Sequence, residues 1–326
     1  MSPLLQGIAT ILIGVGGCVG YFYGANLLLD RVIFPPSGRD PGANISRANA
    51  VRPWLFMAPA MAALGLYLVY PVLGSFWRSL FNRDGGSFIG LGNYTDLAAD
   101  PAFRTAVLNN LLWVLVVPAV STFLGLVAAQ LTDRIRWGNI AKSIIFMPMA
   151  ISFVGASLIW KFVYANEADI GLLNAIRAAL GFDDPVDVIQ IPFWNNFFLM
   201  AILIWIQTGF AMVILSAALR GIPDETIEAA ILDGANPFQI FFRIMVPQIT
   251  GTILVVWTTI TILVLKVFDI VYTMTGGNFG TQILPSYMMS YMFKDDGRAT
   301  AVAFVIMLIV LPVMVWNILQ ARKEMR

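Results

Sequence analysis

Seven apolar runs, each of about twenty residues or more, divide this chain and constrain its fold more than any other feature. An α-helix needs about twenty predominantly apolar residues to cross the hydrocarbon core of a bilayer, which is about 30 Å thick. Only 12% of the 326 residues are charged, and the mean hydropathy of +0.79 lies outside the range of soluble globular domains. We therefore predict an all-α polytopic membrane protein with spans near residues 4–29, 53–76, 105–131, 139–164, 197–219, 249–272 and 300–319.

The first span and the segment after it differ from the other six spans. Residues 4–29 lack the positive start and the small-residue cleavage site of a signal peptide, so we expect a retained helix. Gly16, Gly20 and Gly24 are spaced so that another helix could approach closely. Residues 31–52 are rich in Pro, Gly and Arg, which favours an extended tether. The predicted organisation is an N-terminal transmembrane helix (1–30), a cytoplasmic linker (31–52) and a six-helix core (53–326).

The distribution of lysine and arginine predicts which segments face the cytoplasm. With the C-terminus inside, twelve basic residues fall on inner segments and seven fall on outer segments. This bias places the N-terminus outside, and the C-terminus and residues 220–248 in the cytoplasm. The inner residues are Arg31, Arg39, Arg47, Arg52, Arg134, Arg136, Lys142, Arg220, Arg243, Arg322, Lys323 and Arg326, and the outer residues are Arg78, Arg83, Arg104, Lys161, Arg177, Lys294 and Arg298.

The residue inventory excludes several classes of function. The chain has no histidine and one cysteine, Cys18, which excludes histidine-based zinc sites, haem ligation by histidine and a Ser-His-Asp triad. A net charge of +1 provides no basic field for nucleic acid. No G-x-x-x-x-G-K-[ST] phosphate loop is present, so the chain cannot cradle a nucleotide in the usual way. Gly276, Gly277 and Gly280 of TGGNFG are instead predicted to form a turn.

The segment 220–248 places charge, glycine and proline between two of the most apolar runs. Pro223 suits a first helical turn, and the acidic Asp224 and Glu225 follow where they complement the helix dipole. Gly234 suits a C-terminal stop. The sequence therefore predicts a short amphipathic helix with a small apolar face formed by Ile227, Ala230 and Ile231.

A second helical piece is predicted over residues 237–245. Its apolar residues, Phe238, Phe241, Phe242 and Met245, are spaced to share one side of the helix. Two interpretations of the helix pair follow from the residues alone. The pair either lies along the membrane as a plain connector between two spans, or it inserts into a groove of another protein.

The order of residues in this segment resembles the EAA loop of permease subunits in binding-protein-dependent ABC importers. The pattern is EAA, three residues, G, nine residues and I-x-L-P, and this chain departs from it only at Val246, which replaces leucine. In that family the loop forms a coupling helix that sits in a cleft of a cytoplasmic ATPase subunit. The resemblance implies that role for Glu228, Ala229, Ala230, Asp233, Gly234 and Pro247, with Glu228 facing a basic group of the ATPase.

The resemblance extends over residues 52–326. The stretches RPWLFMAPA, GLGNYTDL, GLLNAI and FDIVYTMTGGNFGT are similar to the carbohydrate-uptake branch, specifically the larger permease of maltose-type systems, with a narrower resemblance to alpha-glucoside permeases. The resemblance implies the type I importer fold, a second homologous permease, two copies of an ATPase that hold ATP and magnesium, and a periplasmic or surface-anchored sugar-binding protein. The chain itself is then a permease in the inner membrane, in contact with membrane lipids, that holds no cofactor and is not an enzyme.

The substrate path is predicted from sugar chemistry and from the resemblance. Sugars are bound by planar polar side chains together with aromatic rings, and the fifth span offers Trp205, Gln207, Thr208 and Phe210 in WIQTGF. Gln207 and Phe210 match positions that contact sugar in maltose-type permeases. Met149, Phe153, Leu263 and Val267 match further such positions, although several are less polar here and ordinary packing remains the alternative.

Lys266 and Asp269 are the only ionisable pair deep within a predicted span, three residues apart on one predicted helical face. Charged groups within membranes are costly and often mark a substrate path, which makes a site role one interpretation. The other interpretation is mutual neutralisation near the outer end of the span, with Lys266 reaching the interface.

The function predicted from these features is ATP-driven import of sugars by alternating access, with alpha-glucosides such as maltose, trehalose or sucrose as substrates. A glycerol-phosphate or polyol importer of the same branch is the nearest alternative, although an arginine-rich path is missing from the spans. A secondary transporter would need more intramembrane carboxylates than Asp269. A membrane-embedded enzyme would need paired carboxylates, and the acidic cluster Asp183, Asp184 and Asp187 reads as a solvated outer turn.

Overall fold

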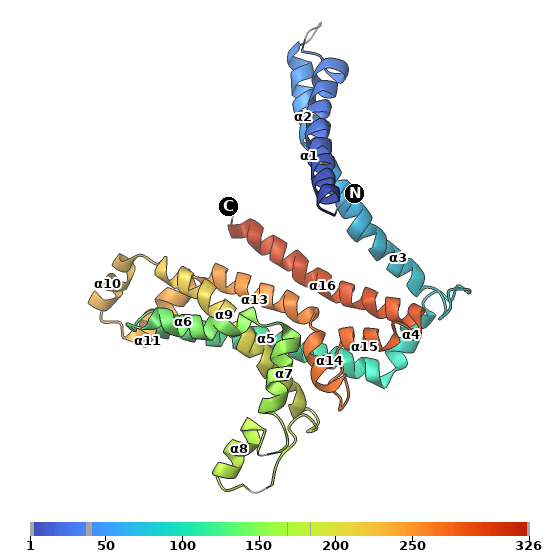
Figure 1. The fold of residues 1–326 in the computed structure, drawn as a ribbon. Helices are drawn as coiled ribbons and strands as arrows, with labels where there is room; N and C mark the ends of the chain where they lie inside the picture. Colours follow the sequence, from blue (N-terminus) through green and yellow to red (C-terminus); the bar gives the residue numbers. More distant parts are fainter. Residues whose placement is uncertain (1–2, 37–40, 168, 183, 325–326) are drawn as a thin grey trace. The chain divides into compact units, whose positions relative to one another are not determined.

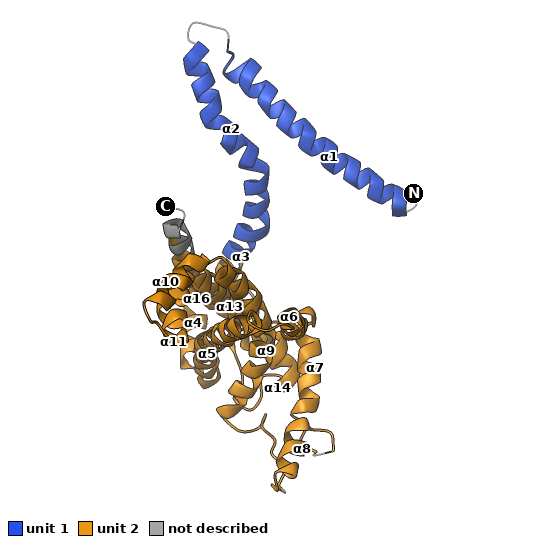
Figure 2. Ribbon diagram, turned by 90° about the vertical axis from the view of Figure 1, so that its left-hand side faces the viewer, with its two compact units in different colours: residues 1–74 blue, residues 75–326 orange. Residues whose placement is uncertain are grey.

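The computed structural model describes residues 3–36, 41–167, 169–182 and 184–324, which form helices and one isolated bridge between Phe81 and Phe88. The all-α fold class predicted from the apolar runs is confirmed. Arg39, Asp183 and Arg326, which the sequence analysis named, lie outside the described residues. The chain forms two compact units, residues 1–74 and 75–326 (Figure 1, Figure 2).

The first unit contains two long helical runs that contact each other. The Tyr21 hydroxyl donates a hydrogen bond to the Leu55 carbonyl at 2.7 Å, and the Phe22 and Phe56 rings meet edge-on at 5.4 Å. A Cβ placed on the predicted close-approach glycines of the first helix would meet no atom of the described chain within 4 Å. The elements are α1 (Pro3–Leu27), the π-helical η1 (Leu28–Ile33), α2 (Pro41–Leu64), the π-helical η2 (Gly65–Val69) and α3 (Tyr70–Ser79), which extends past the unit boundary.

The prediction of an extended tether over residues 31–52 is wrong for most of that segment. Residues 31–33 end η1, residues 41–52 form the first turns of α2, and residues 37–40 lie outside the described chain. Pro41 suits the first turn of a helix because the N–H that proline lacks would have no intrahelical partner there. Arg52 Nη2 also binds Asp30 Oδ1 at 2.7 Å, which joins the middle of α2 to η1.

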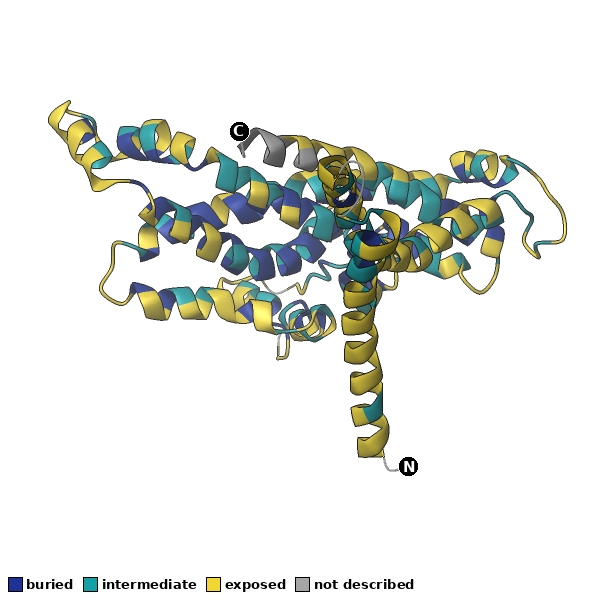
Figure 3. Cartoon of the chain, turned by 90° about the horizontal axis from the view of Figure 1, so that it is seen from above, coloured by how far each residue is buried: buried dark blue, intermediate teal, exposed yellow. Residues whose placement is uncertain are grey.

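The second unit is a helical bundle with α5 and α9 at its centre. In an apolar 18-residue stretch of α9 56% of the residues are buried, against 39% in such a stretch of α5 and 17% in one of α16. Buried residues line the inward faces of the packed helices and exposed residues cover the outward faces (Figure 3). The elements are α4 (Gly92–Ala99), α5 (Pro101–Thr132), α6 (Gly138–Phe146), η3 (Met147–Ala150), α7 (Phe153–Val163), α8 (Leu172–Ala179), α9 (Trp194–Arg220), α10 (Asp224–Leu232), α11 (Pro237–Gln239), η4 (Ile240–Met245), α12 (Val246–Gln248), α13 (Thr250–Leu265), α14 (Asp269–Thr275), α15 (Leu284–Tyr291) and α16 (Asp296–Glu324).

Small residues allow α9 to approach two neighbouring helices at backbone distance. A Cβ on Gly125 of α5 would lie 2.4 Å from the Ala211 Cβ of α9. A Cβ on Gly209 of α9 would lie 2.6 Å from the Ile145 carbonyl oxygen of α6. Helices within membranes commonly associate through such small residues, because they allow close van der Waals contact.

Within the described residues, five helical runs are long and apolar enough to cross a membrane, or up to seven if each bent helix pair counts as one span. The predicted spans 4–29, 53–76, 105–131, 197–219 and 300–319 each fall within one continuous helical run. The predicted span 139–164 instead bends by 106° between Ala150 and Phe153. The break falls at Ile151 and Ser152, whose backbones are both extended. The Ser152 hydroxyl accepts from the Gly155 N–H at 3.1 Å and so caps α7.

Candidate functional site

The EAA residues lie on α10, which projects from one end of the bundle, opposite α4 and α15 (Figure 1). The helix begins at Asp224, with Pro223 as the N-cap residue rather than in the first turn as predicted. Asp224 and Glu225 occupy the first turn, where negative charge complements the helix dipole. The sequence therefore places this helix within one residue of its observed start.

Gly234 ends α10 as predicted. Its φ of +80° is a left-handed conformation that glycine adopts without a steric penalty. The Gly234 N–H donates to the Ile231 carbonyl, and the Ala235 N–H donates to the Ala230 carbonyl, both at 3.0 Å. These bonds satisfy carbonyls at the end of the helix and reverse the chain toward the next helical segment.

The outer surface of α10 is acidic and apolar. Glu228, Ala229 and Asp233 are exposed, and Leu232 beside them is 87% exposed. Among the described residues, no ion pair involves Glu228. Residues 221–242 contain four acidic side chains and no basic side chain, so this surface is suited to a partner that is basic and apolar.

The predicted apolar faces of the loop are only partly buried. On α10, Ala230 is buried and Ile227 is half-buried, but Ile231 is 58% exposed. The second helical piece extends over α11 and η4, and Asn236 and Gln239 form a capping box at its start. Its four apolar residues are divided between two environments, since Phe241 and Met245 are buried whereas Phe238 and Phe242 are exposed, and the following Pro247 in α12 is also exposed.

A partly buried charge network at the base of this loop was not predicted. Asp133, which follows α5, binds Lys142 of α6 and accepts hydrogen bonds from Ser216 at 3.0 Å and Arg220 at 2.7 Å, both on α9. Lys142 Nζ also donates to the Ser216 hydroxyl at 2.7 Å. The network therefore joins the ends of three helices.

The electrostatics of this network depend on the Asp133 carboxylate. Burial would raise the pKa of Asp133, but the hydrogen bonds from Lys142, Arg220 and Ser216 outweigh burial and hold the pKa below its usual range. Asp133 is therefore ionised at neutral pH. The sequence analysis used Lys142 and Arg220 only to predict which segments face the cytoplasm, because no local pattern shows which carboxylate they bind.

Three of the predicted substrate residues line one pocket of about 390 Å³. Met149 and Phe153 lie on either side of the break between η3 and α7, and Asp269 is the first residue of α14. Ser152 lines the same pocket. Apolar side chains beside a carboxylate and a hydroxyl give this pocket both kinds of contact that a sugar ring requires.

The other predicted substrate residues lie outside the lining of that pocket. Gln207 and Val267 are buried, and Trp205, Phe210 and Leu263 are half-buried. The half-buried Thr208 donates its hydroxyl hydrogen to the Ile204 carbonyl at 2.7 Å. The predicted substrate residues beside the two helix breaks therefore share one pocket, whereas those on α9 pack within the bundle.

Lys266 and Asp269 do not share one helical face, which corrects the prediction. α13 ends at Leu265, Lys266 is its C-cap residue, and α14 begins at Asp269. Lys266 is exposed whereas Asp269 is half-buried in the pocket wall. Within the described part of the chain no ion pair connects them, so mutual neutralisation does not account for either residue.

The predicted turn at TGGNFG is confirmed. Gly276, Gly277 and Gly280 all have positive φ angles, as expected for turn glycines. Asn109 of α5 donates to the Gly280 carbonyl at 2.7 Å, and Asn195 of α9 donates to the Phe279 carbonyl at 2.8 Å. These amides attach the turn to the two central helices.

Comparison with known proteins gives relatives over the whole chain. The "Alpha-glucoside transport system permease protein AglF" of Rhizobium meliloti is 61% identical across 99% of both chains. The "Osmoprotective compounds uptake permease protein GgtC" of Synechocystis is 50% identical over 83% of this chain and 100% of its own.

The same architecture occurs in solved ABC importers. A chain of a bacterial alginate ABC transporter, solved in complex with an alginate pentasaccharide-bound periplasmic protein, superimposes with a TM-score of 0.72 over 88% of this chain and 98% of its own, at 19% identity. This likeness concerns the fold alone. The family model of the binding-protein-dependent transport system inner membrane component matches residues 121–325, which include the EAA helix. The chain belongs to this family and is a permease subunit of an ABC importer.

Proposed function

We propose that this chain is one of two permease subunits of an importer for alpha-linked glucosides. The observation that carries the proposal is the exposed α10, which presents the EAA residues and has no ionic partner for Glu228 among the described residues. Full-length identity of 61% to an alpha-glucoside permease supports the sugar class. Osmoprotective compounds are the second candidate substrates, because a relative named for their uptake is 50% identical.

In the proposed coupling step, α10 inserts into a cleft of a cytoplasmic ATPase. Glu228 pairs with a basic group there, and the exposed Leu232 enters an apolar part of the cleft. Gly234 directs the chain back toward the bundle and so fixes the angle at which α10 is presented. Closure of the ATPase dimer then moves the loop, and the Asp133 network transmits that movement to α5, α6 and α9 together.

The proposed assembly contains a second homologous permease, two ATPase subunits that hold ATP and magnesium, and a periplasmic or surface-anchored sugar-binding protein. ATP hydrolysis takes place on the ATPase subunits. The chain lies in the inner membrane among lipids, with its N-terminus outside. Residues 220–248 and the C-terminus lie in the cytoplasm. Residues 1–30 form the N-terminal helix, residues 53–326 form the permease core, and residues 31–52, which are helical from Pro41 onward, connect the two.

The proposed substrate path passes the pocket at the two helix breaks. Asp269 accepts hydrogen bonds from sugar hydroxyls, while Met149 and Phe153 contact the apolar face of the ring. A bend of 106° beside the pocket divides α6 from α7, and such broken helices can rotate about their junction during alternating access. Gln207, Trp205, Thr208, Phe210, Leu263, Lys266 and Val267 are proposed to join this path in a conformation that opens the bundle.

The test is ATP hydrolysis by the co-purified complex in nanodiscs, with and without its cognate binding protein. The ligand panel contains alpha-linked disaccharides, glycerol phosphates and osmoprotective compounds. We expect stimulation by an alpha-linked disaccharide and loss of that stimulation in Glu228→Lys. Stimulation only by another class of ligand would show that the proposed substrate class is wrong. If no ATPase is associated and uptake depends on a cation, the chain would instead be a secondary transporter.

A further inference from the structure

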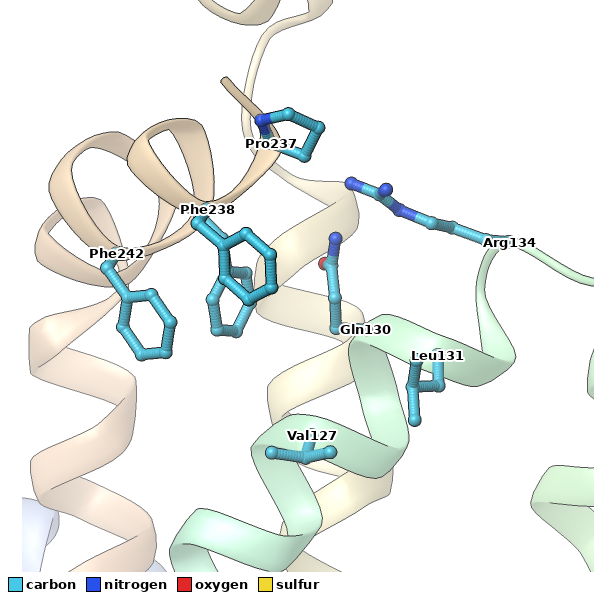
Figure 4. Close-up of a pocket in the computed structure, with 8 residues that line it drawn as sticks. Val127, Gln130, Leu131, Arg134, Pro237, Phe238 and Phe242 are labelled. Atoms are coloured by element: carbon cyan, nitrogen blue, oxygen red, sulfur yellow. The ribbon is translucent and has the colours of Figure 1, made fainter. Parts of the chain in front are cut away.

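A groove of about 270 Å³ lies between the C-terminal end of α5 and the second helical piece of the EAA loop. One wall is the last turn of α5, with Val127 and Leu131, and the other wall carries Phe238 and Phe242 (Figure 4). Leu131, Phe238 and Phe242 are each more than half exposed. The groove is therefore apolar on both sides and open to its surroundings.

A single charged group lines this apolar groove. Arg134 lies two residues beyond the end of the α5 span, and Figure 4 shows its side chain reaching across the mouth of the groove toward Pro237. With the Gln130 amide oriented so that its oxygen faces the guanidinium, that oxygen accepts from Arg134 Nε at 3.0 Å and from Nη2 at 2.6 Å. Gln130 thus fixes the guanidinium at the mouth without neutralising it.

The charge of Arg134 is not compensated by a carboxylate of the described chain. No carboxylate forms an ion pair with Arg134 in residues 3–36, 41–167, 169–182 and 184–324. The carboxylate nearest in sequence, Asp133, is already bound by Lys142 and Arg220. A fixed guanidinium with free donors is well suited to bind a phosphate group.

We propose that the groove binds one anionic phospholipid of the membrane, with its phosphate on Arg134 and an acyl chain between Phe238 and Leu131. The position of the groove favours this occupant, because the α5 span ends at Thr132 and the groove therefore lies at the boundary between hydrocarbon and headgroups. A single cation above an apolar slot complements an amphiphile with an anionic head. Because the two walls belong to α5 and to the EAA loop, the lipid would hold the loop against the bundle.

Native mass spectrometry of the purified complex tests this proposal. The complex is equilibrated with phosphatidylglycerol or with phosphatidylcholine of the same acyl chains, and retained lipid is counted for each variant. One Lys or Arg near a membrane surface adds about 1 kcal/mol of attraction for anionic lipid, so Arg134→Gln should reduce phosphatidylglycerol retention about fivefold. Arg134→Lys should retain most of the preference, and Phe238→Ser should reduce retention of both lipids.

Arg136→Gln is the matched control, because Arg136 is equally basic and exposed but does not line the groove. We expect this variant to retain phosphatidylglycerol like the unmodified complex. An equal loss in the Arg134 and Arg136 variants would indicate a diffuse surface charge and overturn the site. Equal retention of both lipids, or displacement of phosphatidylglycerol by inorganic phosphate alone, would also overturn it.

Discussion

Two acidic groups near the end of α9 differ in how their charge is compensated. Asp133 is half-buried and is bound by Lys142, Ser216 and Arg220, all within this chain. Glu228 is exposed on α10 and has no ionic partner in the described chain. The comparison separates a charge that holds helices together from a charge left available to another subunit. Variants of the two residues should therefore affect different measurements.

Asp133→Asn should have the largest effect on stability. It removes the carboxylate and leaves the half-buried Lys142 without a counter-charge, which costs about 1–3 kcal/mol, between the values for exposed and buried ion pairs. We expect a lower thermal unfolding temperature for the purified complex, measured by the fluorescence of the 9 tryptophans. Asp233→Asn is the control, because Asp233 is exposed and should leave the unfolding temperature unchanged. Equal stability of the Asp133 and Asp233 variants would contradict a holding role for the network.

Glu228→Gln should instead weaken assembly. Loss of one partner of a charge pair at an interface costs about 2 kcal/mol, or about thirtyfold in affinity for the ATPase subunit. The unfolding temperature of the permease should not change, because Glu228 forms no ion pair with the described chain. Affinity is measured by titrating purified ATPase onto the permease pair in nanodiscs. Glu225→Gln, on the first turn of the same helix, is the control, and an identical loss in both variants would point to net charge rather than to one contact.

Gly234→Val should uncouple the two functions at a smaller energetic cost. A left-handed conformation costs a residue with a side chain about 1–2 kcal/mol, so the end of α10 should shift or fray. Gly181→Val is a matched control, because Gly181 also has a positive φ, of +87°, with open space around its Cβ position. We expect substrate-stimulated ATP hydrolysis to fall about tenfold in Gly234→Val, but not in Gly181→Val. Similar rates in both variants would remove the coupling role of Gly234.

The smallest expected effect is the response of the Asp133 network to pH. The pKa of Asp133 in the folded chain lies below its ordinary value of 3.8, so its contribution to stability is complete above that value and is lost as the pH falls through the folded pKa. The unfolding temperature should therefore show no pH dependence arising from Asp133 between about pH 5 and pH 8, because the carboxylate stays ionised over that range. Asp133→Asn should remove part of the acid-induced loss, and a step near neutral pH that the variant abolishes would contradict the assigned pKa.

The sequence was most informative where local chemistry determines local structure. Gly234 was predicted as a helix stop, because few residues other than glycine adopt its backbone conformation. The α5 and α9 spans were predicted from hydropathy with ends within a few residues of those observed. The EAA helix was placed within one residue of its start, because acidic groups and proline both mark helix N-termini.

Features that depend on distant residues were not predictable in this way. Asp133 lies 83 positions from Ser216 and 87 from Arg220, so no local pattern indicates their contact. The break at Ser152 was missed because the apolar run continues through it, and hydropathy does not detect a cap within such a run. The pocket forms where this break lies beside the break before Asp269. Met149, Phe153 and Asp269 were therefore predicted as substrate residues, but the sequence did not show that they share one pocket.

The packing of α5 beside α9 has a consequence for the charges at the loop end of the bundle. Trp113, in the first half of α5, binds Asn196 near the start of α9, whereas Asp133, just after α5, binds Ser216 near the end of α9. The two helices therefore run parallel. Their dipoles therefore add, and each C-terminus contributes about half a negative charge at the same end. Asp133 increases that negative potential, which Lys142 and Arg220 offset. Removing either cation would thus expose the summed field of two helices.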